Sequence, residues 1–116
     1  WNLALDENHG PKNGGCQDCR GVVTVNSTSK VVTRNEEYVL LGHMAKFVKY
    51  GAKRIESSNT RNQDVSQVAF KNLDGTIAIV AFNHKNESQV IRFNKGEESF
   101  SYELESGMLA TFVINN

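Results

Sequence analysis

The sequence lacks the features that mark membrane-spanning and nucleic-acid-binding chains. No apolar run approaches the roughly 20 residues that span a bilayer, so we expect no membrane span. Lys and Arg together number 13, as do Asp and Glu, and this balance leaves no global field to steer nucleic acid or an anionic membrane toward the chain. No basic leader followed by an apolar stretch is present. We therefore expect either a cytosolic chain or a targeting segment upstream of Trp1.

Proline and repetition are also scarce. Pro11 is the only proline, and the sequence has no internal repeat or low-complexity tract. The polar stretch 57–64 comes closest to a linker. A length of 116 residues fits one domain with a real core, but it is far short of an enzyme barrel of roughly 250 residues.

The second half of the chain shows the pattern of short strands. Five segments are rich in β-branched or aromatic residues and are separated by turn residues: 65–72, 76–83, 89–93, 98–104 and 108–114. Asp74-Gly75 lies between the first two, and glycine supplies the positive φ that a tight hairpin turn needs. The segment 76–83 is apolar at nearly every position, which predicts a central strand covered on both faces. The segment 98–104 alternates instead, as a strand with one solvated face does.

One helix is expected before these strands. Asn35 is a suitable cap, the acidic pair 36–37 favours the positive end of the helix dipole, and apolar residues recur every three or four positions to residue 48. Strands are predicted on either side of the helix, at 21–25 and 52–57. A strand, a helix and then about six strands with frequent turns are the signature of a β-sandwich.

Six stretches carry a resemblance to a known family: WNLALD (1–6), GPKN (10–13), GVVTV (21–25), YVLLGHMAKFVKYGAKRI (38–55), LDGTIAIVAFNH (73–84) and ESGMLATFVI (105–114). The sequence resembles the C-terminal part of glycoside hydrolase family 30, the glucosylceramidase and β-1,6-glucanase group. The resemblance implies a mainly β fold, a sandwich of about seven to eight short antiparallel strands with one helix and a strand left from the end of a (β/α)8 barrel. It assigns residues 1–50 to the last barrel strand, loop and helix, with strand 21–25 joining the sandwich, and residues 51–116 to the sandwich.

The resemblance also implies a parent enzyme that hydrolyses β-linked glucosides with retention. Such hydrolysis needs two carboxylates about 5 to 5.5 Å apart, and the family carries these glutamates on the fourth and seventh barrel strands, upstream of Trp1. The acidic pairs at 6–7, 36–37 and 97–98 do not replace them. Neighbouring side chains point apart in a strand, and acids at a helix start favour its dipole. We therefore expect this chain to support a catalytic barrel and to contain no catalytic residue.

Trp1 and Asn2 are the substrate-binding candidates that the resemblance supplies. The matching tryptophan of the family lines the pocket for the glucosyl unit, and an indole offers a flat apolar face to a sugar ring. We expect this role only in the context of an intact barrel. Asp6 and the loop Gly10–Asn13 are weaker candidates for the rim of the pocket, and His43 is expected to pack or hydrogen-bond near the junction of barrel and sandwich.

Cys16 and Cys19 are compatible with a disulfide, free thiols or a metal site. A redox dithiol would be expected at the start of a helix in a thioredoxin-like context, which is missing here. A structural zinc site needs four ligands, and the three scattered histidines do not supply a second spaced pair. The resemblance to secreted glycosidases favours the disulfide. It also implies a secreted or extracytoplasmic parent protein without a metal or other cofactor.

Two other functions remain open from the residues alone. A free-standing carbohydrate-binding sandwich would expose two or three aromatic side chains on one face, whereas Phe100 and Tyr102 share a face with Leu104, which favours a place in the core. An interaction module would use the apolar stripe of the helix, which lacks the barrel as a partner and would promote self-association.

Overall fold

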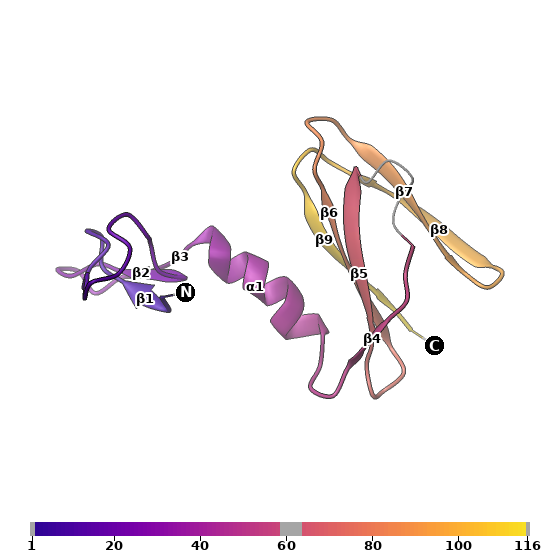
Figure 1. The fold of residues 1–116 in the computed structure, drawn as a ribbon, viewed down its shortest axis with the longest axis horizontal. Helices are drawn as coiled ribbons and strands as arrows, with labels where there is room; N and C mark the ends of the chain where they lie inside the picture. The colour runs from indigo at the N-terminus through magenta and orange to yellow at the C-terminus, as the bar shows by residue number, and fades with distance from the viewer. Residues whose placement is uncertain (1, 59–63, 116) are drawn as a thin grey trace. The chain divides into compact units, whose positions relative to one another are not determined.

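The computed structural model describes residues 2–58 and 64–115. These residues form nine strands and one helix, and the chain divides into two compact units, Trp1–Gly42 and His43–Asn116 (Figure 1). The helix α1, Glu36–Phe47, crosses the division between the units. The sequence analysis placed a boundary after residue 50, just beyond this helix. The predicted fold class is confirmed, because the chain is mainly β with one helix and a sandwich.

The first unit contains a small three-stranded sheet. Its strands are β1 (Ala4–Leu5), β2 (Val23–Val25) and β3 (Val32–Arg34), in the order β1-β2-β3. β1 pairs with β2 in parallel, and β2 pairs with β3 in antiparallel register. Leu5 and Val22 are the buried apolar side chains of this unit. A Cβ on Gly21 would lie 2.7 Å from the backbone nitrogen of Leu5, so only glycine allows the chain to approach β1 this closely.

The three-stranded sheet differs from the sequence-based prediction in two respects. Strand 21–25 was expected to join the sandwich, but β2 pairs only with β1 and β3 among the described residues. The strand β3 was not predicted at all. Its three residues are exposed and lie between a turn at Lys30, where φ is 61°, and the start of α1. So short and exposed a run leaves little periodic signal.

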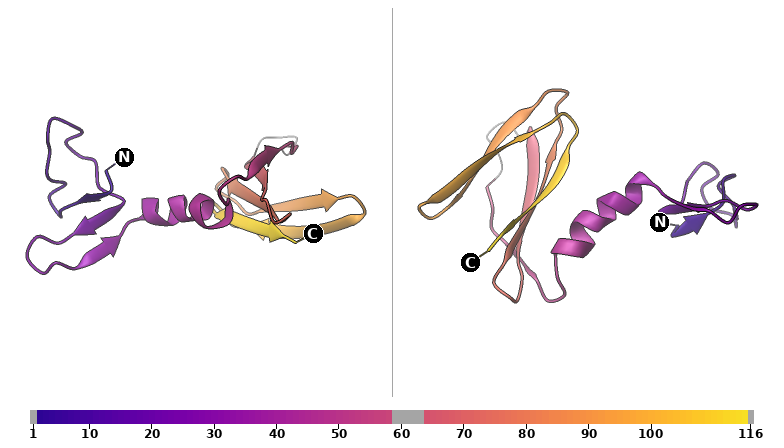
Figure 2. Two further views of the ribbon diagram at one scale, coloured as in Figure 1. Left: turned by 90° about the horizontal axis from the view of Figure 1, so that it is seen from below. Right: turned by 180° about the vertical axis from the view of Figure 1, so that it is seen from behind.

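The second unit is the sandwich. Its larger sheet has the order β4-β5-β6-β9, all antiparallel, and the hairpin β7-β8 forms the second layer (Figures 1 and 2). The strands are β4 (Lys53–Ile55), β5 (Val65–Lys71), β6 (Ile77–Asn83), β7 (Gln89–Lys95), β8 (Glu98–Leu104) and β9 (Leu109–Ile114). The described sandwich therefore has six strands, and the five strands predicted in the second half are all present.

The core lies between the two layers. It consists of Val65, Ala81, Ile91 and Leu104, with Phe93, Met108, Ala110 and Phe112 packed against it. β6 pairs on both edges and is buried at most positions, as expected for the central strand. Tyr102 and Phe100 on β8 contact the ring of Phe112, with centroid distances of 5.2 and 5.8 Å. These aromatic side chains share the face of Leu104, as the alternation on β8 predicts, but Phe100 is 38% exposed and Tyr102 is 44% exposed, so they lie at the edge of the core.

The turn between β5 and β6 also fixes the end of α1. Gly75 has φ of 88°, and the backbone nitrogen of Thr76 donates to Asp74 Oδ1 at 3.0 Å. Asn72 is buried at the start of this turn; its Nδ2 donates to the carbonyl of Phe47 at 3.0 Å, and its Oδ1 accepts from the backbone of Lys49 at 2.9 Å. The hydrogen bonds from Lys49 Nζ and then from Thr76 lower the pKa of Asp74 to about 2. One buried amide therefore links the C-terminal turn of α1 to the hairpin.

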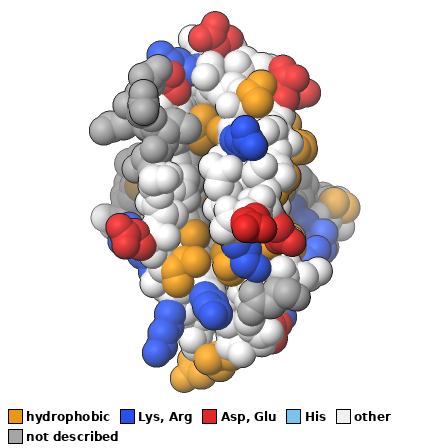
Figure 3. Space-filling view, turned by 90° about the vertical axis from the view of Figure 1, so that its right-hand side faces the viewer, with side chains coloured by type: hydrophobic (Ala, Val, Ile, Leu, Met, Phe, Trp, Pro, Cys, Tyr) orange, Lys and Arg blue, Asp and Glu red, His pale blue; other side chains and the backbone are white. Residues whose placement is uncertain are grey.

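The surface is mixed in charge. Figure 3 shows acidic and basic side chains interspersed on one face, in keeping with the balance of the sequence. In the part of the chain that the structure describes, no helix has the length and apolar character to cross a bilayer.

Candidate functional site

The loop after β1 is built around the carboxylate of Asp6. Oδ1 of Asp6 accepts hydrogen bonds from the backbone nitrogens of Asn8 at 2.9 Å and Gly10 at 2.7 Å. The backbone nitrogen of Asp6 donates to the carbonyl of Gly10 at 2.8 Å, which closes the turn. Aspartate commonly organises a tight turn in this way. Asp6, a weak candidate for the rim of a sugar pocket, thus uses one of its two carboxylate oxygens to shape the loop that carries His9.

A second carboxylate anchors this loop to the β2–β3 hairpin. Glu7 accepts from the backbone nitrogen of Ser27 at 2.8 Å and from its hydroxyl. These hydrogen bonds, the hydroxyl contact first, lower the pKa of Glu7, and the charge of Lys30 acts in the same direction. Two carboxylates therefore fix the start of the loop, although nearly all of the loop residues are exposed.

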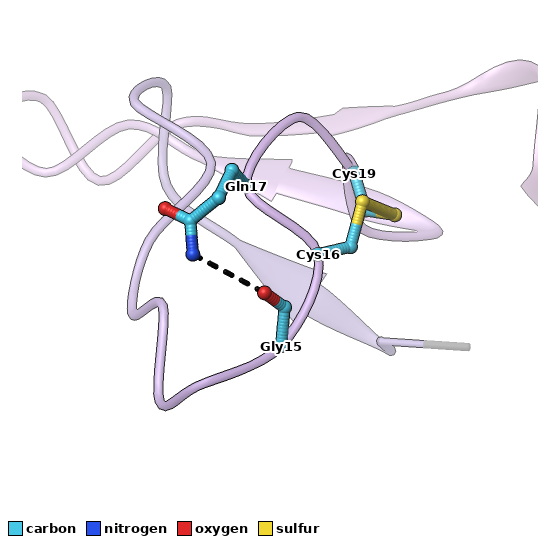
Figure 4. Close-up of a disulfide and its surroundings, with 4 residues drawn as sticks. All are labelled: Gly15, Cys16, Gln17 and Cys19. Atoms are coloured by element: carbon cyan, nitrogen blue, oxygen red, sulfur yellow. Dashed lines mark hydrogen bonds between the residues drawn. A yellow bond between two sulfur atoms is a disulfide. The ribbon is translucent and has the colours of Figure 1, made fainter.

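Cys16 and Cys19 form a disulfide in the next part of the loop, with their Cα atoms 5.4 Å apart. Figure 4 shows the bond closing a single turn, in which Gln17 Nε2 donates to the carbonyl of Gly15 at 3.2 Å. Of the three interpretations of this pair, the structure contains the disulfide. Among the described residues, no group of three or more His, Cys, Asp or Glu side chains is placed to hold a metal ion.

Arg20 joins the end of the loop to the first turn of α1. Its Nε donates to Glu37 Oε1 at 3.0 Å, and its Nη2 bonds to Glu36. The hydrogen bonds to Glu37 and Glu36 raise the pKa of Arg20, and the bond from Arg20 lowers the pKa of Glu37. The acidic pair at the helix start therefore has a specific cationic partner in addition to the helix dipole.

These segments line an open cavity of about 640 Å³ in the first unit. Its walls are the disulfide, Val22 and five polar side chains: Asn2, His9, Asp18, Arg20 and Glu37. Two polar atoms of the lining residues, His9 Nδ1 and Glu37 Oε2, are out of contact with solvent and have no hydrogen-bond partner among the described residues. The volume of the cavity is in the range of small-molecule sites.

The second unit contains a cavity of about 390 Å³, lined by residues of β4, β5, β6, β7 and β9, and several polar pairs. His43 Nδ1 lies 2.9 Å from the hydroxyl of Thr111 on β9, so the hydrogen bond expected of this histidine is present. Ser66 Oγ lies 2.6 Å from His84 Nε2, an arrangement that could activate a hydroxyl. The nearby carboxylate of Asp64 pairs with Lys85 at 3.2 Å. Among the described residues, this carboxylate forms no hydrogen bond to the imidazole, so the three groups do not form a catalytic triad.

A known protein family matches most of the second unit. The sequence profile of the glycosyl hydrolase family 30 β-sandwich domain matches residues 51–112. The chain belongs to glycoside hydrolase family 30. Within this family, the endo-1,6-beta-D-glucanase of Neurospora crassa is 27% identical over 123 residues, which include 98% of this chain and 26% of that protein.

Solved structures of the family are similar over nearly the whole chain. The endo-beta1,6-glucanase BT3312 is 35% identical, with a TM-score of 0.85, over 97% of this chain and 26% of that one. SrfJ from Salmonella typhimurium is 26% identical, with a TM-score of 0.92, over 100% of this chain and 26% of that one. The chain thus spans about a quarter of the length of the family members that it matches. Both units are included in the likeness.

Of the two predicted substrate-binding residues, one lies beside the cavity. Trp1 lies outside the described residues. Asn2 is exposed and contributes to the cavity wall. The sequence analysis missed His9, Arg20 and Glu37, which come from three separate segments. A positive φ at His9, 62°, is a local feature that no periodicity pattern reveals.

Proposed function

We propose that this chain is the sandwich region, together with the last strand, loop and helix of the barrel, of a retaining β-glycosidase. The observation that carries this proposal is the likeness of the chain, over 97% and 100% of its length, to about a quarter of two family 30 structures. Residues 1–50 would be the end of the barrel and residues 51–116 the sandwich. The sandwich would support the barrel, and the two catalytic carboxylates would lie in the part of the enzyme that the chain does not span.

The substrate class that we infer is a β-linked glucan, with a β-1,6 linkage preferred over glucosylceramide. Two of the similar proteins are named as β-1,6-glucanases. Trp1 and Asn2 would contact the sugar in the intact barrel, where active-site residues lie at the C-terminal ends of the strands. The disulfide of Cys16 and Cys19 supports a secreted or extracytoplasmic location, because oxidising compartments favour such bonds.

The first prediction is that the 116-residue chain does not hydrolyse aryl β-glucosides or β-1,6-glucan. Neither carboxylate of the retaining pair is expected in it, and losing the acid–base group alone typically costs about 100- to 10,000-fold in rate. The assay compares the chain with the protein from the longer native reading frame, each purified from a host that lacks β-glucosidases. The longer protein should turn over both substrates, and the chain should match the buffer blank. Activity that co-purifies with the chain would refute the assignment of the chemistry to the barrel.

The second prediction concerns α1, which has no buried residue. Five of its apolar side chains are between 37% and 58% exposed: Tyr38, Val39, Leu40, Leu41 and Met44. We propose that they pack on the barrel in the longer protein and promote self-association of the isolated chain. Each Leu or Val that becomes buried contributes about 1.5 to 3 kcal/mol. Sedimentation velocity should therefore show a concentration-dependent dimer.

Leu41→Glu should weaken this dimer by about tenfold or more, because a buried apolar contact is replaced by a charge. Lys46→Glu is the matched control, since it changes charge at an exposed position on the same helix. A chain that stays monomeric up to about 1 mM, a concentration at which a contact worth about 4 kcal/mol is half formed, would exclude self-association.

A further inference from the structure

The disulfide of Cys16 and Cys19 lies in an exposed part of the first unit. Every residue from 11 to 20 is exposed, and both cysteines line the open cavity of this unit. Solvent therefore reaches both residues without any unfolding of the chain. Exposed disulfides are attacked by thiolates more readily than buried ones, and they are typically the bonds that a protein exchanges.

The bridge closes a ring of small size, since the two cysteines are three positions apart in the sequence (Figure 4). A disulfide stabilises a fold mainly by restricting the unfolded chain, and it does so least when the loop that it closes is short. This bridge therefore contributes little to the stability of the first unit as a whole. Its effect is on the conformation of the loop that contains it.

Few other interactions fix this part of the loop. Among the described residues, the segment 11–19 forms hydrogen bonds only within itself, from Gly14 to the carbonyl of Lys12 and from Gln17 to the carbonyl of Gly15. None of these bonds reaches the sheet or the helix. The disulfide is thus the main constraint on the backbone of the segment.

The residue directly after the ring is Arg20, which connects the loop to the start of α1. Its Nε donates to Glu37 Oε1 at 3.0 Å, and its Nη2 bonds to Glu36. All three side chains are partly exposed. An exposed ion pair contributes little by itself, because holding two long side chains in one geometry costs entropy. The pairing of Arg20 therefore depends on how firmly the preceding residues hold its backbone.

We propose that Cys16 and Cys19 are a reversible redox site, which a dithiol reduces in the folded chain, and that reduction loosens Arg20 from the acidic pair at the start of α1. The exposed ring supplies the site of attack, and its position next to Arg20 supplies the coupling to the helix. All of these residues belong to the first unit. The proposal does not rest on the function proposed above.

The reaction is a thiol–disulfide exchange with two successive steps. A thiolate of the dithiol attacks one sulfur of the bridge, the S–S bond breaks, and the other cysteine leaves as a thiolate that takes up a proton. The second thiolate of the dithiol then attacks the mixed disulfide and releases the first cysteine. The dithiol gives up two electrons and becomes a cyclic disulfide, and Cys16 and Cys19 become thiols.

The first test is reduction of the ¹⁵N-labelled chain by dithiothreitol, followed by NMR through the amides of Cys16 and Cys19. Reduction should go to completion without denaturant. Its rate should be within about tenfold of the rate in concentrated urea, because access to the bridge requires no unfolding. The amides of β2, Val23–Val25, should keep their signals, which shows that the first unit remains folded.

The second test measures the coupling to Arg20. Exchange of its Nε–H with water should become about threefold or more faster on reduction, because the bond to Glu37 is formed less of the time. Glutathione disulfide should restore the original rate. Cys16→Ser combined with Cys19→Ser should reproduce the fast exchange and should not respond to dithiothreitol.

A matched pair of variants identifies the residue that transmits the change. Arg20→Gln should be reduced at a similar rate, but reduction should no longer shift the amide signal of Glu37, because the ion pair is missing. Lys12→Gln is the control, since it also removes an exposed cation from the loop. In that variant, reduction should shift the Glu37 signal as it does in the parent chain.

Three results would overturn the proposal. Reduction that occurs only in urea would show that the folded chain protects the bridge. Loss of the β2 signals on reduction would show that the bridge maintains the fold of the unit. Unchanged exchange at Arg20 Nε–H would show that the ring and the ion pair are independent. None of these results bears on hydrolysis by the longer protein, which tests the proposed function.

Discussion

Asn83→Asp should destabilise the sandwich by about 4 kcal/mol at pH 7, more than any conservative exchange on its surface. Asn83 is fully buried at the end of β6. Its Nδ2 donates to the carbonyls of Glu87, Leu104 and Glu105 at 2.8, 3.1 and 2.9 Å, and its Oδ1 accepts from the backbone of Lys85 at 2.9 Å. The exchange replaces the donor with a charged oxygen that faces three carbonyl oxygens.

The loss of stability caused by Asn83→Asp should increase with pH. Burial beside carbonyl oxygens raises the pKa of the introduced carboxyl above its unfolded value of about 3.9. The folded state then binds more protons than the unfolded state, so the variant is least impaired, relative to the parent, below about pH 3.9. The impairment grows as the pH rises through the folded pKa. At low pH the protonated carboxyl can donate one of the lost hydrogen bonds.

Urea unfolding, monitored by NMR through the β6 amides at pH 3 and pH 7, measures both effects. Tryptophan fluorescence would not serve, because the only tryptophan is Trp1, outside the second unit. The matched control is Asn94→Asp, an exposed position on β7, which should change stability by less than about 0.5 kcal/mol. Equal losses from the two exchanges would show that the amide of Asn83 does not hold the loops together.

The role of Asn83 illustrates what the sequence could not reveal. The pattern correctly ends strand 76–83 at this residue, because an apolar run is followed there by polar residues. Asparagine in that position is also typical of a turn. Its burial depends on carbonyls from the β8–β9 connection, which are far away in the chain. Local periodicity carries no information about such partners.

The difference between local patterns and distant partners also explains which parts of the fold were predicted. The hairpin at Asp74-Gly75 was predicted because its turn chemistry is local, and the glycine has the positive φ required. The sheet of the first unit was not predicted, because β1 and β2 are parallel and are separated in the sequence by a long loop. Parallel neighbours are never connected by a short turn, so no local signal identifies them.

The candidate site was hidden for a related reason. Trp1 and Asn2 were found through family resemblance, and the disulfide was one of three interpretations of a spaced pair. His9 and Glu37 looked like an isolated histidine and a helix-start acid, and each of those has an ordinary structural explanation. Only folding of the loop against the start of α1 places them on one cavity.

Leu104→Ala should cost the sandwich about 3 to 4 kcal/mol, the usual range for a fully buried leucine. Leu104 is 0% exposed at the end of β8, and it packs in the cluster of Val65, Ala81 and Ile91. All three neighbours lie on strands, so they have little freedom to move into the space left by the side chain. The penalty for the residual cavity should therefore add to the lost burial of apolar surface.

The control for this exchange is Val90→Ala on β7, where the side chain is 72% exposed. It also shortens an aliphatic side chain, but it removes little buried surface, so a change of less than about 0.5 kcal/mol is expected. Urea unfolding of both variants, followed through the β6 amides, gives the comparison. If Leu104→Ala were no more harmful than Val90→Ala, the contact between the β7–β8 layer and the larger sheet could not be the main source of the sandwich's stability.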